Sequence, residues 1–167
     1  MPASGPDRGV DRLRLLVSGY YGFGNLGDEA LLATIVEGIR RRHPGAVVDV
    51  LSADPNGTSR TYGVEATPRA DMRAVRTAIL RADCVLSGGG GLFQNSTSTR
   101  SLLYYTGIVR SAIRSGKKTM IFAQSIGPLD FIGRAIVRVA CRGIGAATVR
   151  DERSRTLLQQ SIPHLAV

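Results

Sequence analysis

The chain alternates short apolar runs with longer segments in which apolar residues recur every three or four positions. The short runs lack regular polar alternation, which is typical of parallel strands that are buried on both faces. The longer segments have a helical period, as in the set that shares one face, Leu31, Leu32, Ile35, Val36 and Ile39. This alternation predicts an α/β fold, a Rossmann-like parallel sheet with helices on both faces.

The pattern defines the expected elements. Strands are predicted at residues 13–18, 46–51, 64–67, 84–87, 119–123 and 146–149. Helices are predicted at residues 28–42, 71–81, 100–115 and 131–142, and from residue 151 to just before Pro163, with a short helical turn closed by Gly63. Together they predict one Rossmann-like domain, residues 13–162, which follows a disordered tail, residues 1–12.

Three loops with ligand-binding chemistry follow the first, fourth and fifth predicted strands. They are the glycine-rich loops at residues 22–27 and 88–91 and the loop at residues 124–128. In a doubly wound sheet, the first and fourth strands are neighbours where the strand order reverses, and ligands bind at their carboxyl ends. We therefore expect the three loops to converge on one edge of the sheet.

Composition narrows the classes of function. None of the apolar runs in the 167 residues reaches the ~20 residues of a membrane span. The net charge of +9 comes almost entirely from arginine, and without a nucleic-acid motif it favours a solvated basic surface over nucleic-acid binding. Cys84 and Cys141 lie far apart, which predicts reduced core cysteines in a cytoplasmic protein. Metal-ligand spacing is absent, so no metal is expected.

Residues 22–27 also match the GxGxxG pattern of dinucleotide-binding loops. Two features oppose that interpretation. The glycines begin three residues after Gly19, which makes the loop longer than the tight fingerprint turn, and Asp28 and Glu29 place negative charge where a pyrophosphate would bind. A dinucleotide-binding domain is therefore a minority hypothesis, and no tight NAD binding is expected.

A wider set of motifs is more specific than any single loop. It comprises GFGNLGDEAL at residues 22–31, SGGGGLFQ at residues 87–94, QSIGP at residues 124–128 and RDERS at residues 150–154. Together they resemble the polysaccharide pyruvyltransferase family, CsaB type, over residues 13–162. The resemblance implies an enzyme that moves a pyruvyl group from phosphoenolpyruvate onto two sugar hydroxyls of a cell-surface polysaccharide precursor, forming a ketal. It also implies an architecture similar to the two facing domains of GT-B glycosyltransferases.

The resemblance implies that this chain is the N-terminal half of such an enzyme. Residues 163–167 lie about where the crossing to a second domain would begin, and the family's arginine and histidine that grip phosphoenolpyruvate are expected in that half. This chain alone is therefore expected to lack donor-binding residues. A second domain or partner half is expected to supply them, with no cofactor besides the donor substrate. The competing hypotheses are the acceptor-binding half of a GT-B glycosyltransferase and a non-catalytic partner subunit.

Asp28 is the candidate catalytic residue, because ketal formation needs a base for the sugar hydroxyls. A role as a simple helix N-cap is an equally good interpretation of Asp28. Arg150 is a candidate for neutralising a phosphate or carboxylate, against the alternative that it is a surface neighbour of a capping Asp151. The remaining substrate-binding candidates are the following polar and glycine residues: Gly24, Asn25, Gly27, Gly89, Gly90, Gln94, Asn95, Gln124 and Ser125.

The amides among these candidates pair donors with acceptors, as recognition of sugar hydroxyls requires. Asn95 and the Ser/Thr-rich run after it also fit an ordinary polar loop with a helix cap. The second glycine-rich loop would bring the backbone close to an acceptor or a phosphate, or would pack neighbouring βα units.

The predicted helix at residues 131–142 suggests a further contact. It is apolar except for Arg134, Arg138 and Arg142, which fall on one stripe. The resemblance to GT-B enzymes that act on lipid-linked sugars implies weak contact with the inner face of the membrane. Because an apolar helix belongs against the sheet, we expect only the arginines to reach anionic lipid, in a salt-sensitive way and without insertion.

Overall fold

The computed structural model describes residues 12–96, 98–163, 165 and 167, so the predicted tail falls almost entirely outside the described residues. Six strands form one parallel sheet with the order β3-β2-β1-β4-β5-β6. The order reverses between β1 and β4, which are paired neighbours. The predicted parallel α/β fold and the predicted pairing of the first and fourth strands are both confirmed.

The elements alternate along the chain as predicted. The strands are β1 (Arg14–Tyr21), β2 (Val47–Ser52), β3 (Glu65–Pro68), β4 (Cys84–Gly88), β5 (Lys118–Gln124) and β6 (Ala146–Val149). The helices are α1 (Leu26–Arg42), α2 (Pro55–Tyr62), α3 (Met72–Arg81), α4 (Thr99–Arg114), α5 (Phe131–Ala140) and α6 (Glu152–Ser161).

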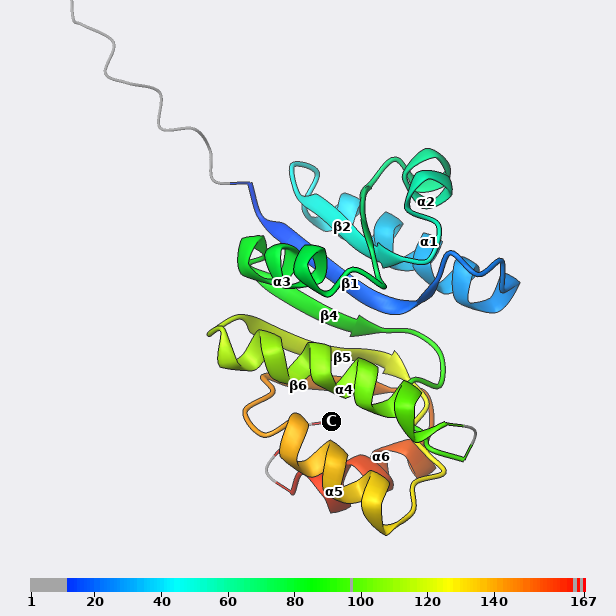
Figure 1. Ribbon diagram of the computed structural model, residues 1–167, viewed down its shortest axis with the longest axis vertical. Coiled ribbons are helices and arrows are strands. Elements are labelled where there is room, and N and C mark those ends of the chain that lie inside the picture. Colours follow the sequence, from blue (N-terminus) through cyan, green and yellow to red (C-terminus); the bar gives the residue numbers. More distant parts are fainter. Residues whose placement is uncertain (1–11, 97, 164, 166) are drawn as a thin grey trace, which may run out of the picture.

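Helices cover both faces of the sheet. Figure 1 shows α3 and α4 in front of the sheet, α5 next to α4 beyond the β6 edge, and α1 behind the sheet. Behind the sheet, Leu32 and Ile35 of α1 pack in one apolar cluster with Val17 of β1. In front, α3 and α4 pack on β1 and β4, and a separate cluster joins α4 and α5 to Leu158 of α6. Because the helices cover the faces of the sheet, the edge at the carboxyl ends of the strands is formed by loops.

Two boundaries near the first glycine-rich loop differ from the prediction. Strand β1 continues to Tyr21, which pairs with Ser52 of β2. The Tyr21 side chain is 1% exposed, and its hydroxyl donates a 2.6 Å hydrogen bond to the Gly88 carbonyl oxygen. Helix α1 begins at Leu26, because Asn25 caps it. The loop is consequently shorter than expected, and its glycines directly follow the strand. The argument that the loop is too long for a dinucleotide fingerprint is therefore wrong.

Helix α5 also departs from the expectation that its apolar side chains pack against the sheet. Phe131 is 87% exposed, Ile132 is 61% exposed and Val139 is 56% exposed. The helix buries only the stripe Gly133, Val137 and Ala140. Because α5 packs beside α4 and α6, its outer apolar residues contact solvent, so that expectation is wrong.

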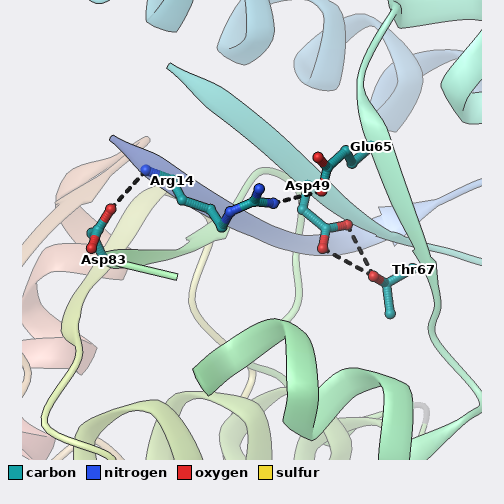
Figure 2. A network of polar contacts seen from close by, with 5 residues as sticks. All are labelled: Arg14, Asp49, Glu65, Thr67 and Asp83. Carbon is teal, nitrogen blue, oxygen red and sulfur yellow. Dashed lines mark hydrogen bonds and ion pairs between the residues drawn. The ribbon is translucent and has the colours of Figure 1, made fainter. Parts of the chain in front are cut away.

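A polar network joins the amino-terminal ends of the central strands to the β2–β3 pair (Figure 2). The Arg14 amide donates a 2.8 Å hydrogen bond to Asp83, and its guanidinium forms a 2.6 Å ion pair with Glu65. Asp49 of β2 is 8% exposed, and both of its carboxylate oxygens accept from the Thr67 hydroxyl at 3.0 Å. Burial raises the pKa of the Asp49 carboxyl, and the Thr67 hydrogen bond offsets only part of that rise.

The raised pKa of Asp49 predicts a pH-dependent effect of Asp49→Asn. Asp49 contributes stability below its unfolded pKa of about 3.9, and this contribution is lost as pH rises through the higher folded value. Relative to the wild-type chain, Asp49→Asn should therefore be more favourable near pH 7 than near pH 4, as measured by urea unfolding at about those two pH values.

Asp83→Asn is the matched control, since it removes an exposed carboxylate from the same network. An Asp49→Asn effect on the free energy of unfolding that is equal at both pH values would contradict the prediction.

Candidate functional site

Loops that follow three strands are joined by backbone hydrogen bonds at the carboxyl edge of the sheet. The Ser125 amide donates to the Gly90 carbonyl oxygen at 3.0 Å, and the Arg150 amide donates to the Gln124 carbonyl oxygen at 3.1 Å. The Gly89 amide donates to the carbonyl oxygen of Phe122 at 3.0 Å. The second glycine-rich loop and the loops after β5 and β6 therefore form one connected surface.

Side chains of α1 and α2 fix the first glycine-rich loop. The Glu29 carboxylate accepts from the Gly22 amide at 2.8 Å with one oxygen and from the Tyr62 hydroxyl at 2.8 Å with the other. Burial, followed by the hydrogen bond to Glu29, raises the pKa of Tyr62 to about 12. Both carboxylate oxygens of Glu29 thus bind groups of the protein itself.

Asn25 is the N-cap of α1. Its side-chain oxygen accepts from the Gly27 amide at 3.0 Å and from the Asp28 amide at 3.2 Å. Two free amides in the first turn of the helix are therefore bound by a side chain of the preceding loop, and Asn25 rather than Asp28 is the N-cap. The amides of Gly22, Gly27 and Asp28 are the donors that a phosphate would use, and all three already donate to side chains of the protein.

An open groove of about 330 Å³ lies between α1 and the second glycine-rich loop. It is lined by Asn25, Gly27, Asp28, Ala30, Leu31, Thr34, Gly90 and Arg150. We call it the Asp28 groove. It brings together five of the predicted site residues from three separate loops.

Gly90 is the position where this groove requires glycine. Its φ is +70°, and a Cβ atom there would lie 2.6 Å from the Asp28 carboxylate oxygen Oδ1. Any larger residue would displace the Asp28 carboxylate. The glycine therefore lets that carboxylate lie directly against the backbone of the β4 loop.

Asp28 and Arg150 give the groove its electrostatic character. Burial is the largest cause that raises the pKa of Asp28, followed by the neighbouring Glu29 charge, while Arg150 acts in the opposite direction. Within the described residues, neither the Asp28 carboxylate nor the Arg150 guanidinium has a hydrogen-bond or ion-pair partner. A guanidinium and a carboxylate thus share one groove.

Other predicted site residues support the loops. Gln124 is fully buried, and its Nε2 donates to the Ser87 carbonyl oxygen at 2.7 Å and to the Ser87 hydroxyl at 2.8 Å. Gly89 packs beneath the Tyr21 hydroxyl, with φ +75°. Ser125 contributes its amide to the link with Gly90. These residues hold the β4 and β5 ends together and do not line the groove.

The remaining candidates lie outside the Asp28 groove. The side-chain amide nitrogen of Asn95 donates a hydrogen bond to the Asp130 carboxylate at 2.7 Å, which links its loop to the N-cap of α5. Gln94 accepts from the Ser96 hydroxyl at 2.7 Å. Gly24 lines a separate hollow of about 270 Å³ between the first glycine-rich loop and α2.

An aromatic cluster on the other side of the first glycine-rich loop was missed by the sequence analysis. The Tyr20 and Phe23 rings stack with centroids 4.1 Å apart, and they are 40% and 48% exposed. The Arg69 guanidinium lies 4.9 Å from the Phe23 centroid and 4.5 Å from that of Tyr104, and donates to the Tyr105 hydroxyl at 3.1 Å. Three aromatic residues within residues 20–23, in a chain with 5% aromatic residues, were the available signal.

A Rossmann-like sheet with a groove at the reversal of strand order defines an α/β protein of the class whose ligands bind at that edge. The sequence model of the polysaccharide pyruvyl transferase family matches residues 25–163, so this chain belongs to that family and is a transferase. The family implies a polysaccharide acceptor and phosphoenolpyruvate as the donor. No curated protein shows a significant match to the sequence.

The capping geometry predicts which residue at the start of α1 maintains stability. Asn25→Ala should lower the free energy of unfolding by about 1 kcal/mol, because two amides lose their shared acceptor. Asp28→Asn should change it little, since the Asp28 carboxylate accepts no hydrogen bond within the described residues. Urea unfolding of both variants measures the difference.

Asn25→Asp is the control, because Asp caps a helix about as well as Asn. If Asp28→Asn proved more destabilising than Asn25→Ala, the assignment of the cap would be wrong.

Proposed function

We propose that this chain provides the acceptor-binding half of the transferase, with the acceptor sugar in the Asp28 groove. The reaction moves a pyruvyl group from phosphoenolpyruvate onto two hydroxyls of a cell-surface polysaccharide precursor and leaves a cyclic ketal. The observation that carries the proposal is the placement of Asp28 and Arg150 in one groove, neither with a partner within the described residues.

The chemistry explains why a carboxylate is needed there. Two sugar oxygens form bonds to the central carbon of phosphoenolpyruvate, the enol methylene gains a proton to become a methyl group, and phosphate leaves. Both sugar hydroxyls lose their protons: one proton is added to the methylene carbon, which becomes the methyl group, and the other leaves on the phosphate. We assign Asp28 as the base for a hydroxyl, because its carboxylate lines the groove without a partner among the described residues and burial raises the pKa of its carboxyl above the ordinary value.

Arg150 and Asn25 supply recognition in this proposal. The exposed Arg150 guanidinium can pair with a phosphate or carboxylate oxygen through two parallel hydrogen bonds. Asn25 uses its side-chain oxygen for the cap, which leaves the two N–H donors of its amide for a sugar hydroxyl.

The stacked Tyr20 and Phe23 rings extend the acceptor surface beyond the Asp28 groove. Tyr20 lies near the end of β1, Phe23 lies on the same loop as Asn25, and the Arg69 guanidinium lies over the Phe23 ring. The C–H face of a sugar ring packs on exposed aromatic faces of this kind, so we assign the pair to a second sugar unit of the acceptor.

The donor requires more positive charge than the groove contains. Phosphoenolpyruvate carries a phosphate and a carboxylate, whereas the groove contains one guanidinium, that of Arg150, and also the negative carboxylate of Asp28. We therefore propose that residues outside this chain, in a second domain or partner half of GT-B type, hold the donor. No group of three or more potential metal ligands occurs among the described residues.

The first functional test is Asp28→Asn in the assembled transferase. Turnover, measured as phosphate released from phosphoenolpyruvate in the presence of the polysaccharide acceptor, should fall by roughly 10²–10⁴-fold. The rise of activity with pH that reports ionisation of the base should disappear from the residual rate.

Asp71→Asn provides the matched control, because Asp71 caps α3 away from the groove and Asn caps equally well. Turnover of Asp28→Asn equal to that of this control would remove Asp28 from the mechanism.

The second test concerns NAD. Because Asn25 and Glu29 occupy the amides that would bind a pyrophosphate, titration calorimetry of this chain with NAD should show no binding with a dissociation constant on the order of 1–100 µM. Binding in that range would instead support a dinucleotide-binding domain.

A further inference from the structure

Three adjacent helices, α3, α4 and α5, have an unusual distribution of charge. Together they contain no Asp or Glu. Their basic residues are all arginines: Arg73, Arg76, Arg81, Arg100, Arg110, Arg114, Arg134 and Arg138. None of them forms an ion pair within the described residues. By contrast, α1 on the opposite face carries both acidic and basic residues.

The same helices expose large apolar side chains. Met72 of α3 is 59% exposed, Leu103 of α4 is 52% exposed, and Ile132 and Val139 of α5 are 61% and 56% exposed. Two grooves, of about 300 and 400 Å³, lie on either side of α4, and Leu103 lines both. Figure 1 shows these three helices next to one another. The outer surface of α3, α4 and α5 is hereafter the arginine-rich helix face.

We propose that the arginine-rich helix face binds the surface of an anionic lipid bilayer. A bilayer interface offers anionic headgroups to the arginines and acyl chains to the apolar side chains at the same time. This proposal does not depend on the proposed function of the Asp28 groove. No helix within the described residues is long and apolar enough to span a bilayer, so the contact is peripheral.

Charge and polarity argue against the other occupants of this face. A second copy of the chain would place the arginines of this face opposite the same arginines of its partner across a two-fold interface, which is repulsive. Nucleic-acid phosphates would pair with the arginines but would leave Leu103 and Ile132 against a charged backbone without an apolar partner.

The apolar side chains change the kind of binding that is expected. An arginine stripe alone would bind lipid only electrostatically, and salt would abolish it. Here Ile132 and Val139 lie beside Arg110, whose guanidinium donates to the Val139 carbonyl oxygen at 2.5 Å at the end of α5. Apolar insertion therefore adds a contribution that salt does not screen.

Co-sedimentation of the full chain with vesicles tests the proposal. Vesicles of equal parts phosphatidylglycerol and phosphatidylcholine should bind the chain at low salt, and vesicles of phosphatidylcholine alone should bind it far less. Arg76→Gln and Arg114→Gln should each weaken the apparent affinity about fivefold. Ile132→Ser should weaken it about five- to tenfold and should abolish the residual binding at about 0.5 M salt.

Two control variants match these changes on other surfaces. Arg41→Gln removes an exposed arginine of α1, and Leu26→Ser removes a leucine that is 88% exposed at the start of α1. Both should bind vesicles like the wild-type chain, and circular dichroism verifies that every variant is folded.

Three results would overturn the proposal. They are absence of sedimentation with anionic vesicles, loss of binding in the two control variants equal to that in Ile132→Ser, and a wild-type dimer in light scattering that Ile132→Ser converts to monomer. The last would assign the face to a second copy of the chain. Binding to an acidic protein with none to vesicles would assign it to a protein partner.

Discussion

The geometry of the Asp28 groove depends on the hydrogen bond from the Tyr21 hydroxyl to the Gly88 carbonyl oxygen. This bond joins the ends of β1 and β4, the two strands between which the order of the sheet reverses. Tyr21 is almost completely buried, so water cannot replace the bond at low cost. Gly89 and Gly90 of the second glycine-rich loop lie beside the Tyr21 hydroxyl and the Asp28 carboxylate, respectively, where a side chain at either glycine would not fit.

The first glycine-rich loop illustrates how two side chains change the ligand preference of a Rossmann-like turn. An unmodified turn presents free amides to a phosphate. In this chain Asn25 and Glu29 bind those amides from within, so the loop keeps its shape without an anion. What faces outward is then a carboxylate and an amide, a combination suited to hydroxyl groups.

Much of the architecture could be predicted because apolar periodicity reports burial directly, and the parallel sheet, its helices and the converging loops follow from it. The groove residues from the two glycine-rich loops and Arg150 were also accessible from motif spacing. Capping by Asn25 rather than by Asp28 could not be predicted from motif spacing. It depends on the directions in which the Gly27 and Asp28 amides point, which spacing does not encode. The exposure of apolar residues of α5, such as Ile132, was not predicted. Helix periodicity does not show whether an apolar face packs against the sheet or only partly against neighbouring helices.

The absence of acidic residues from α3, α4 and α5 also affects how the molecule moves. Uncompensated positive charge on α3, α4 and α5, together with mixed charge on α1, gives the protein a permanent electric asymmetry across the sheet. Near any negatively charged boundary, this asymmetry exerts a torque before contact occurs. Rotational diffusion is thereby biased toward one orientation, with the sheet parallel to the boundary and its carboxyl edge, where the Asp28 groove opens, directed sideways along it.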